Sequence, residues 1–444
     1  MVDLYESTMA AGYFENKIEA ITTFELFVRE MPKNRSFLVS AGLQQAIEFL
    51  LNLKFDGEDL EYLKKLPVFK SVSRDFFDFL SEIKFDGNVW AIPEGEVFFP
   101  SEPLIRITAP IIQVQILETF LLSVLNFQCM VASKSARVVQ AAECDGKKRG
   151  IMEFGSRRAH GPEAGVYAAR ASFIAGCMGT SNVYAGKSFG IPVYGTAAHS
   201  WTMAFDSEFE SFKAYHRVFP DSTILLIDTY DVEEGAKNAV KLNKKFYGVR
   251  IDSGSLLEYS KLVRRILDEN GHNEAIIVAS GDLDEFKIRK LVENSAPIDS
   301  FGVGTRMTTS EDAPSLGGIY NLVEIEKHKE NKFKAKFSDE KATYPGKKQV
   351  YRILDKDSNY IKDVIGLVED QIPENHETLL KEIINKGKLV YEFPDMKSLK
   401  NNFKRNFSKL HNDYIRFENP ETHPVTYSRN LQQLFDELKE KQSY

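Results

Sequence analysis

The sequence predicts an α/β protein: an irregular (β/α) barrel, a discontinuous α+β N-terminal domain and a helical C-terminal extension. Between residues 126 and 315, short apolar runs each end in a polar or glycine-rich tip, and helical segments separate the runs. This alternation is typical of a parallel sheet with right-handed crossovers. Tips with Asp, Arg, Gly, Thr or His follow at least six runs. A barrel collects such tips at one rim, whereas an open sheet concentrates them at one switch point, so we favour the barrel.

The segments that flank the predicted barrel have a different pattern. Before it, Leu43 and Ile47 recur at helical spacing, and a β-prone run covers 22–27. β-prone runs return after the barrel and would rejoin the first sheet. We therefore expect one domain built from 1–125 plus about 316–380, around a barrel domain at 126–315.

The end of the chain, residues 381–444, is expected to form the helical extension. Leu431, Leu434, Phe435 and Leu438 recur at the spacing of an amphipathic helix. Lys and Glu occupy the opposite face, which is typical of a surface helix.

The net charge and the number of cysteines argue against several classes of function for this chain. The 444 residues carry a net charge of −7, which offers no general attraction for nucleic acid or for an anionic membrane. An anionic substrate must then be held by a local group of basic residues. The three cysteines are widely spaced, which favours neither a disulfide framework nor a zinc site. With no signal peptide and no long apolar run, we expect a cytoplasmic protein without nucleic-acid or membrane partners.

A histidine on a turn of small residues is the most informative local feature. An apolar run leads into GTAAHS at 195–200, which contains Thr196 and His199. Histidine can take a phosphoryl group reversibly, and the small neighbours leave room for a phosphate. The alternative for such a histidine is a helix cap or a hydrogen-bonded core residue.

Arg250 and Asp252 lie two residues apart at the end of a predicted strand. Side chains alternate along a strand, so both point to one face. The pair would hold an anionic ring beside a sugar hydroxyl or a metal ion. The alternative is an internal salt bridge.

Three further tips have the residues of an anion site. EFGSRR at 153–158 combines a flat ring, Phe154, with two arginines that suit phosphate or carboxylate, although arginine pairs are also common on solvated surfaces. SGD at 280–282 and GVGT at 302–305 have the glycines that let backbone N–H groups approach a phosphate. Asp228 ends another run and would bind a metal diphosphate or a ribose hydroxyl; we give the alternative role, helix N-cap, to Asp231.

Taken together, these motifs resemble those of the nicotinate phosphoribosyltransferases, in the type II phosphoribosyltransferase group. The similarity covers almost the whole chain. It includes DLY (3–5), EFGSRR (153–158), GTSN (179–182), GTAAHS (195–200), LIDTYD (226–231), VRIDSG (249–254), GVGT (302–305) and TYPGKKQVYR (343–352).

The resemblance implies that nicotinate and 5-phosphoribosyl 1-diphosphate form nicotinate mononucleotide and diphosphate in NAD salvage. It implies coupled ATP hydrolysis, Mg²⁺ as cofactor, and His199 as the phosphorylated residue. It also implies an obligate homodimer with shared active sites, in which Phe154 lies under the pyridine ring and Tyr5 of the partner subunit lies over it.

The remaining roles that the resemblance implies concern the two substrates. Arg250 and Thr196 would contact nicotinate, and Arg157 the phosphorylated substrate. Asp228 and Asp252 would act at the ribose and the metal-bound diphosphate. The turns for the 5′-phosphate would contain Gly281, Gly304 and Thr305.

Two positions bear on the limits of the resemblance. The family usually has Asp-Ser-Gly-Asp where this chain has Ser255 as the fourth residue, so we assign Ser255 no role. Nicotinamide phosphoribosyltransferases have Asp at the position of Ser181. A serine hydroxyl donates to a carboxylate that an Asp would repel, so Ser181 favours the acid. The alternatives are a transferase for nicotinamide or quinolinate, or a non-catalytic ligand sensor on the same barrel.

Overall fold

The computed structural model describes residues 1–33, 35–327, 330–338 and 341–442. The chain forms a mixed α/β fold with two compact units. Unit 1 consists of Met1–Met130 and Ser315–Tyr444, and unit 2 of Val131–Pro314. The boundary near residue 130 falls inside the long helix α6 (Glu118–Ala142).

Unit 1 is built on a seven-stranded sheet in the order β13-β12-β1-β5-β3-β17-β18. These strands are β1 (Ile21–Val28), β3 (Asn88–Ala91), β5 (Pro103–Pro110), β12 (Gly318–Lys327), β13 (Glu330–Phe333), β17 (Lys381–Asn385) and β18 (Lys388–Leu389). The chain returns to the first sheet after residue 315, where β12 pairs antiparallel with β1. A four-stranded sheet consists of β14 (Lys348–Leu354), β15 (Tyr360–Leu367), β16 (His376–Thr378) and β19 (Val425–Tyr427). The two short strands β2 (Leu38–Val39) and β4 (Val97–Phe98) pair separately.

Strand β1, which lies between β12 and β5, is buried along most of its length, although it contains polar residues. Burial of a polar group is costly unless the group has a partner. Thr23 shares a hydrogen bond of 2.8 Å with Thr108 of β5, and Glu25 forms an ion pair of 2.7 Å with Lys348 of β14. These contacts allow polar side chains at the centre of the unit.

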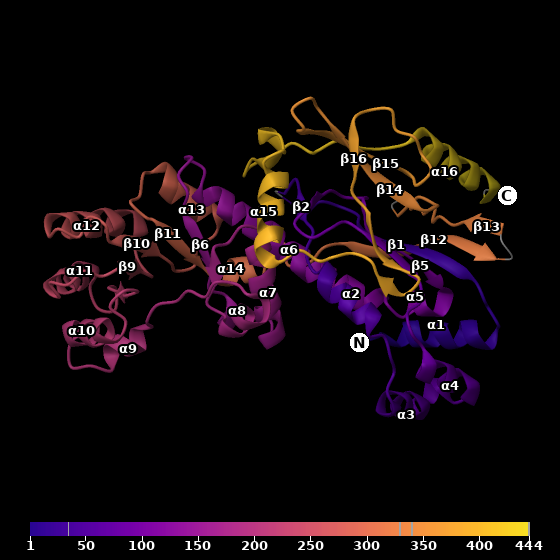
Figure 1. Ribbon diagram of the computed structural model, residues 1–444, viewed down its shortest axis with the longest axis horizontal. Helices are drawn as coiled ribbons and strands as arrows, with labels where there is room; N and C mark the ends of the chain where they lie inside the picture. The colour runs from indigo at the N-terminus through magenta and orange to yellow at the C-terminus, as the bar shows by residue number, and fades with distance from the viewer. Residues whose placement is uncertain (34, 328–329, 339–340, 443–444) are drawn as a thin grey trace. The chain divides into compact units, whose positions relative to one another are not determined.

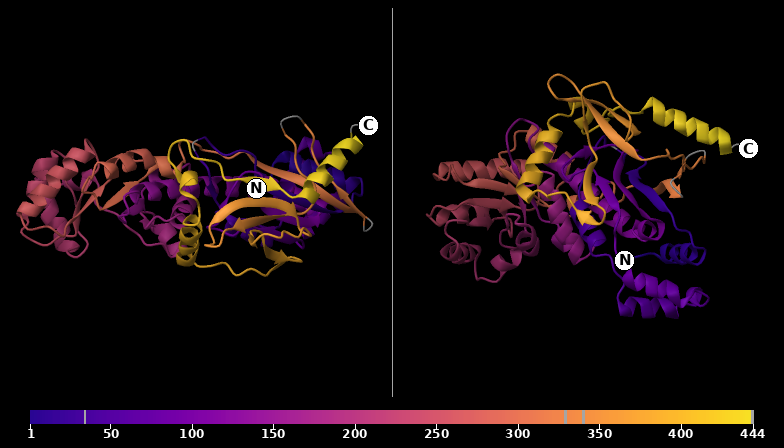
Figure 2. Two further views of the ribbon diagram at one scale, coloured as in Figure 1. Left: turned by 90° about the horizontal axis from the view of Figure 1, so that it is seen from above. Right: turned by 45° about the vertical axis from the view of Figure 1, so that its right-hand side comes forward.

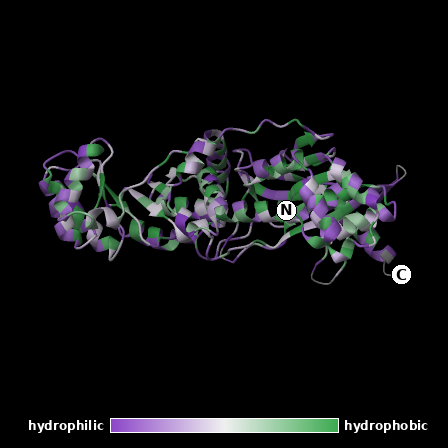
Figure 3. Cartoon of the chain, turned by 90° about the horizontal axis from the view of Figure 1, so that it is seen from below, coloured by the Kyte–Doolittle hydropathy of each residue, from purple (hydrophilic) through white to green (hydrophobic). Residues whose placement is uncertain are grey.

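Helices cover the sheets of unit 1. They are α1 (Leu4–Glu15), α2 (Leu43–Leu51), α3 (Gly57–Lys65), α4 (Arg74–Glu82), α5 (Ile111–Gln115), α15 (Met396–Phe407) and α16 (Arg429–Gln442), with the short helices η1 (Pro67–Phe69) and η3 (Asn412–Ile415). Helices α3 and α4 form a pair that projects from the rest of the unit (Figure 2). Hydrophilic and hydrophobic residues alternate along the helices (Figure 3). Among the described residues, no helix combines the length and the apolar character that crossing a membrane requires.

The predicted helical extension at 381–444 is only partly present. The amphipathic helix at its end is α16, on which Leu431 is fully buried. However, the described part of this segment also contains the three strands β17, β18 and β19, and β17 pairs antiparallel with β3. Its strand character depends on a partner almost three hundred residues earlier in the chain, which local periodicity does not reveal.

Unit 2 contains a parallel sheet in the order β7-β6-β11-β10-β9-β8. Its strands are β6 (Gly150–Glu153), β7 (Gly179–Thr180), β8 (Ile224–Leu226), β9 (Gly248–Ile251), β10 (Ile276–Ala279) and β11 (Ser300–Val303). The helices are α7 (Pro162–Ile174), α8 (Val183–Phe189), α9 (His199–Met203), α10 (Glu208–Val218), α11 (Val232–Lys241), α12 (Leu256–Glu269), α13 (Glu285–Glu293) and α14 (Thr305–Thr308), with η2 (Ser156–Arg158). Helices α10, α11 and α12 lie next to one another along the sheet (Figure 1).

Within the described residues, the parallel sheet is not hydrogen bonded into a closed cylinder. The last strand, β11, pairs with the first, β6, and a single parallel bridge from Thr180 to Val193 continues the sheet beyond β7. Among the described residues, no pairing joins that segment to β8. The irregular (β/α) barrel that the sequence predicts is therefore not confirmed, because one seam of the sheet stays open in the described part of the chain.

Candidate active site

The carboxyl ends of the parallel strands bring most of the predicted site residues to one edge of unit 2. Parallel strands end at the same edge, so the residues that follow them become neighbours. The residues on or just after these strands are Phe154 (β6), Ser181 (β7), Asp228 (β8), Arg250 and Asp252 (β9), Gly281 (β10), and Gly304 and Thr305 (β11).

Arg250 is fixed by three neighbouring side chains. Its Nη2 lies 3.0 Å from Oδ1 of Asp252, and its Nε donates to Oγ of Ser280 at 2.9 Å. Its Nη1 donates to Oγ1 of Thr196. The hydroxyl of Ser280 in turn donates to Asp252. The Arg250 side chain is 14% exposed, so it is held in place and still has a face available to a ligand.

His199 begins helix α9 beside the same carboxylate. Its Nδ1 lies 3.2 Å from the Thr229 hydroxyl, and its Nε2 lies 3.7 Å from Oδ2 of Asp252. The side chain is 40% exposed. The imidazole is therefore oriented by its neighbours and accessible to solvent. The contacts of His199 with Thr229 and Asp252 cross the open seam of the sheet. The hydrogen bond between Thr196 and Arg250 crosses the same seam.

Asp228 connects the ends of β8 and β9. Its Oδ2 accepts from the backbone N–H of Asp252 at 2.9 Å and from the Ser253 hydroxyl at 2.7 Å. Its Oδ1 is buried and has no hydrogen-bond partner among the described residues. Asp231 caps helix α11 by accepting from the N–H of Glu234, as expected, whereas the role of Asp228 at the substrate stays a prediction.

The two glycine-rich turns follow the adjacent strands β10 and β11. Gly281 has φ +99°, and a Cβ there would lie 1.9 Å from the carbonyl oxygen of Asp252. Glycine is thus required at this turn both for its conformation and for the close approach of another backbone. Gly304 and Thr305 lie where β11 leads into α14. A Cβ on Gly302 would come within 2.5 Å of the Phe154 ring, so this glycine makes room for the ring.

Two predicted site residues lie outside this group of contacts. Arg157 is exposed on η2. Tyr5 belongs to α1 of unit 1, where partial burial and the Glu118 carboxylate raise the pKa of its phenol. The contact of Tyr5 with a partner subunit stays a prediction.

Sequence reasoning missed three residues that organise the site. Ser280 bridges Arg250 and Asp252, and Thr229 contacts His199. Glu153 is fully buried, and burial raises the pKa of its carboxyl. All three stand inside motifs that the sequence singles out, but their importance depends on which strands are neighbours.

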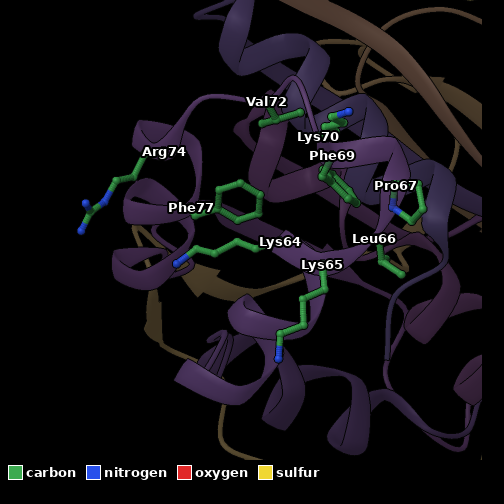
Figure 4. A pocket seen from close by; sticks show the side chains of 9 residues that line it. All are labelled: Lys64, Lys65, Leu66, Pro67, Phe69, Lys70, Val72, Arg74 and Phe77. Carbon is green, nitrogen blue, oxygen red and sulfur yellow. The ribbon is translucent and has the colours of Figure 1, made fainter.

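An open pocket of about 620 Å³ on the α3–α4 pair of unit 1 has several basic residues in its lining. The side chains of Lys64, Lys65 and Arg74 point in different directions rather than toward a common point (Figure 4). They do not form a convergent anion site, and none of the predicted site residues lines this pocket.

The chain matches three family models. They are described as the nicotinate phosphoribosyltransferase N-terminal domain (residues 1–126), the nicotinate phosphoribosyltransferase family (150–345) and the nicotinate phosphoribosyltransferase C-terminal domain (372–435). The chain is 42% identical over 394 residues to nicotinate phosphoribosyltransferase pncB2 of Mycobacterium tuberculosis, covering 87% of this chain and 82% of that protein.

Further similarities extend over nearly the full length. The Bacillus subtilis nicotinate phosphoribosyltransferase is 37% identical over 481 residues, covering 99% of this chain and 95% of that protein. The crystal structure of human nicotinic acid phosphoribosyltransferase has a TM-score of 0.87 at 26% identity, covering 99% of this chain and 100% of the human chain. The site geometry and these similarities agree, and the chain belongs to the nicotinate phosphoribosyltransferase family.

Proposed function

We propose that the protein transfers a phosphoribosyl group from 5-phosphoribosyl 1-diphosphate to nicotinate, forming nicotinate mononucleotide and diphosphate in NAD biosynthesis. The observation that carries this proposal is the guanidinium of Arg250, held by Thr196, Ser280 and Asp252 at the edge where the strands end. A guanidinium that is held in one orientation and stays partly accessible suits the carboxylate of nicotinate, because its fixed positive charge attracts the carboxylate and a remaining N–H can donate to it.

In the proposed reaction the pyridine nitrogen attacks C1 of the ribose, and the bond from C1 to the diphosphate oxygen breaks. The protein contributes mainly position and electrostatics. Phe154 would stack on the pyridine ring, and Ser181 would donate to the carboxylate of the acid. Near the ribose, the carboxylate of Asp252 would stabilise the positive charge that develops at C1.

The phosphate groups would lie over the turns after β10 and β11. Gly281 and Gly304 let backbone N–H groups approach an anion, and Thr305 adds a hydroxyl. The exposed guanidinium of Arg157 would contact the phosphorylated substrate. This arrangement gives the two ends of the ribose phosphate separate binding groups.

We propose Mg²⁺ as the metal cofactor, held by Asp228 and Asp252 through the diphosphate or water. The buried, unpartnered Oδ1 of Asp228 is a hard oxygen donor that fits this ion. The described residues contain no group of three or more His, Cys, Asp or Glu that would hold a metal without substrate. Mg²⁺ is often bound by one or two carboxylates together with substrate phosphates, so the donor set is suitable. When bound, the ion would supply positive charge that stabilises the departing diphosphate.

ATP is proposed to phosphorylate His199. The γ-phosphoryl group would leave ADP, form a bond to a ring nitrogen, and later pass to water as phosphate. The contacts of the ring with Thr229 and Asp252 would orient it, and its exposure supports access by ATP. The phosphate would add about −1.5 to −2 charge beside the diphosphate site, by analogy with other phosphorylated side chains.

We further propose that the enzyme acts as a homodimer, with Tyr5 of one subunit covering the pyridine ring bound in the other. The exposed position of Tyr5 on α1 leaves its ring available for such a contact. Within each subunit, unit 2 would be an irregular barrel. Its open seam, between the segment at Val193 and β8, would be bridged by side-chain contacts rather than by backbone pairing.

Two variants and one competition assay test the proposal. Arg250→Ala should raise the KM for nicotinate strongly while the thermal unfolding temperature changes little. His199→Asn should abolish nicotinate-stimulated ATP hydrolysis and leave some ATP-independent transfer; mass spectrometry after incubation with ATP should locate phosphate on His199 in the wild type. Normal nicotinate kinetics in Arg250→Ala would refute the assigned pocket. Preference for nicotinamide or quinolinate in the competition assay would refute the assigned substrate.

A further inference from the structure

Glu153, at the end of β6, is a fully buried carboxylate that connects three turns. Its Oε1 accepts from the Thr308 hydroxyl at 2.9 Å and from the backbone N–H of Gly155 at 2.5 Å. Its Oε2 accepts from the Thr180 hydroxyl at 2.6 Å. One side chain thus joins the ends of β6 and β7 to helix α14.

Each of these turns contains residues of the proposed substrate pocket. Gly155 directly follows Phe154, and Thr180 directly precedes Ser181. Thr308 ends the short helix α14, which Thr305 begins. Strands β6 and β11 are paired neighbours (Figure 1). Glu153 therefore lies at the junction between the proposed nicotinate pocket and one of the two proposed phosphate turns.

The network continues from Glu153 along the β7 turn. The Thr180 hydroxyl accepts from the N–H of Asn182 at 3.0 Å, and the Asn182 side chain donates to the Ser156 hydroxyl at 3.0 Å. The backbone carbonyl of Glu153 also accepts from the N–H of Ser181 at 2.9 Å. The β7 turn is thus tied to Glu153 through both its backbone and its side chains.

The environment of Glu153 argues against a role in stability alone. In the described part of the chain, no Lys, Arg or His forms an ion pair with it, and its three donors are neutral. Burial of a carboxylate without a cation is costly. Burial accordingly raises the pKa of Glu153. A well-packed apolar residue would avoid this cost but would not hold the three turns together.

We propose that Glu153 is a positioning residue that sets the spacing between the nicotinate pocket and the 5′-phosphate turn. This inference rests on the proposed function. In that reaction the pyridine nitrogen must meet ribose C1 in line, and small displacements of the reacting atoms are costly to the rate. Glu153 does not touch substrate in this role; it acts through Thr180, Gly155 and Thr308.

The first test compares Glu153→Ala and Glu153→Gln in steady-state kinetics with nicotinate and 5-phosphoribosyl 1-diphosphate. Glu153→Ala should lower kcat at least tenfold and raise the KM for both substrates, because both turns lose their common anchor. Glu153→Gln should stay within about threefold of wild type, since its carbonyl can accept from Thr308 and its amide can donate to Thr180. Wild-type kcat and KM in Glu153→Ala would overturn the inference.

A second set of variants covers the case in which Glu153→Ala does not fold. Thr308→Val removes one hydroxyl and should lower kcat, whereas Thr308→Ser should restore it. Thr223→Val is the matched control, because Thr223 is also buried, its hydroxyl donates to the Phe219 carbonyl, and it lies before β8, at the opposite end from the strand tips. Thr223→Val should affect only the unfolding temperature. Equal kinetics in Thr308→Val and Thr223→Val would overturn the inference.

The wild-type assay separates this inference from the proposed function. A wild type that does not turn over nicotinate overturns both. An active wild type with a normal Thr308→Val variant overturns the positioning role alone. Where Glu153→Ala folds, adding Thr308→Val to it should cause no further loss, because the two residues act through one hydrogen bond. Additive losses would contradict the mechanism.

Discussion

Ser280→Ala removes a hydroxyl that bonds to both charged groups at the centre of the site. Ser280 is 3% exposed, accepts from Nε of Arg250 at 2.9 Å, and donates to Oδ1 of Asp252. Alanine keeps the backbone and leaves both partners in place. The change therefore tests whether the activity depends on how Arg250 and Asp252 are oriented, and not only on the presence of these two residues.

The expected loss follows from the strength of these bonds. A hydrogen bond to a charged group contributes roughly 1.5–3 kcal/mol. The side chains of Arg250 and Asp252 are 14% and 26% exposed, so water would replace part of what is lost. We therefore expect Ser280→Ala to cost about as much free energy as one such hydrogen bond contributes, although it removes two. At about 1.4 kcal/mol for each factor of ten, kcat/KM for nicotinate should fall roughly 10- to 100-fold.

The assay is steady-state kinetics with nicotinate as the varied substrate, supported by thermal unfolding. Ser260→Ala is the matched control, since Ser260 is equally buried in unit 2 but donates only to the Leu257 carbonyl within α12. The control should keep wild-type kcat/KM. A Ser280→Ala variant with unchanged kcat/KM would refute the conclusion that Ser280 orients Arg250 for the substrate.

Three other predictions concern the turns and the buried carboxylate. Gly281→Ala should unfold at a clearly lower temperature than Gly271→Ala, because both glycines have positive φ but only Gly281 would place a Cβ against another backbone; equal unfolding temperatures would contradict this. Gly302→Ala should displace the Phe154 ring and raise the KM for nicotinate, and an unaltered KM would place the ring elsewhere. Because burial raises the pKa of Glu153 above 4.5, the folded protein holds this proton to higher pH than the unfolded chain, and wild-type stability falls as pH rises from 4.5 through the raised pKa. As the pH rises through that window, the unfolding temperature of wild type should therefore fall relative to that of Glu153→Gln. A difference between the two temperatures that does not change with pH would show that the carboxyl keeps its ordinary pKa.

Several local features of the site follow from the sequence alone. The alternation of side chains along a strand places Arg250 and Asp252 on one face, and the structure pairs them at 3.0 Å. The apolar run before Asp228 and the turn chemistry at Gly281 likewise mark strand ends. These features depend on residues close together in the chain, so periodicity and conformational preference are sufficient to find them.

Other features depend on contacts that no local pattern contains. The helical prediction for 381–444 was wrong where β17 pairs with β3, since that strand is stabilised by a distant partner. The same holds for the open seam beside Val193, which depends on which strands find a pairing partner. A short strand has little preference of its own, and the neighbouring strand decides its state.

The sequence by itself determined the strand ends, their order in the chain and the kinds of side chain they present, because backbone periodicity and turn chemistry act over a few residues. Only the tertiary structure decided which ends become neighbours. That arrangement explains why Ser280 joins Arg250 to Asp252, and why the buried Glu153 ties Thr180 to Thr308. Such contacts form between residues 27 to 155 positions apart, and they exist only once the parallel strands have assembled side by side.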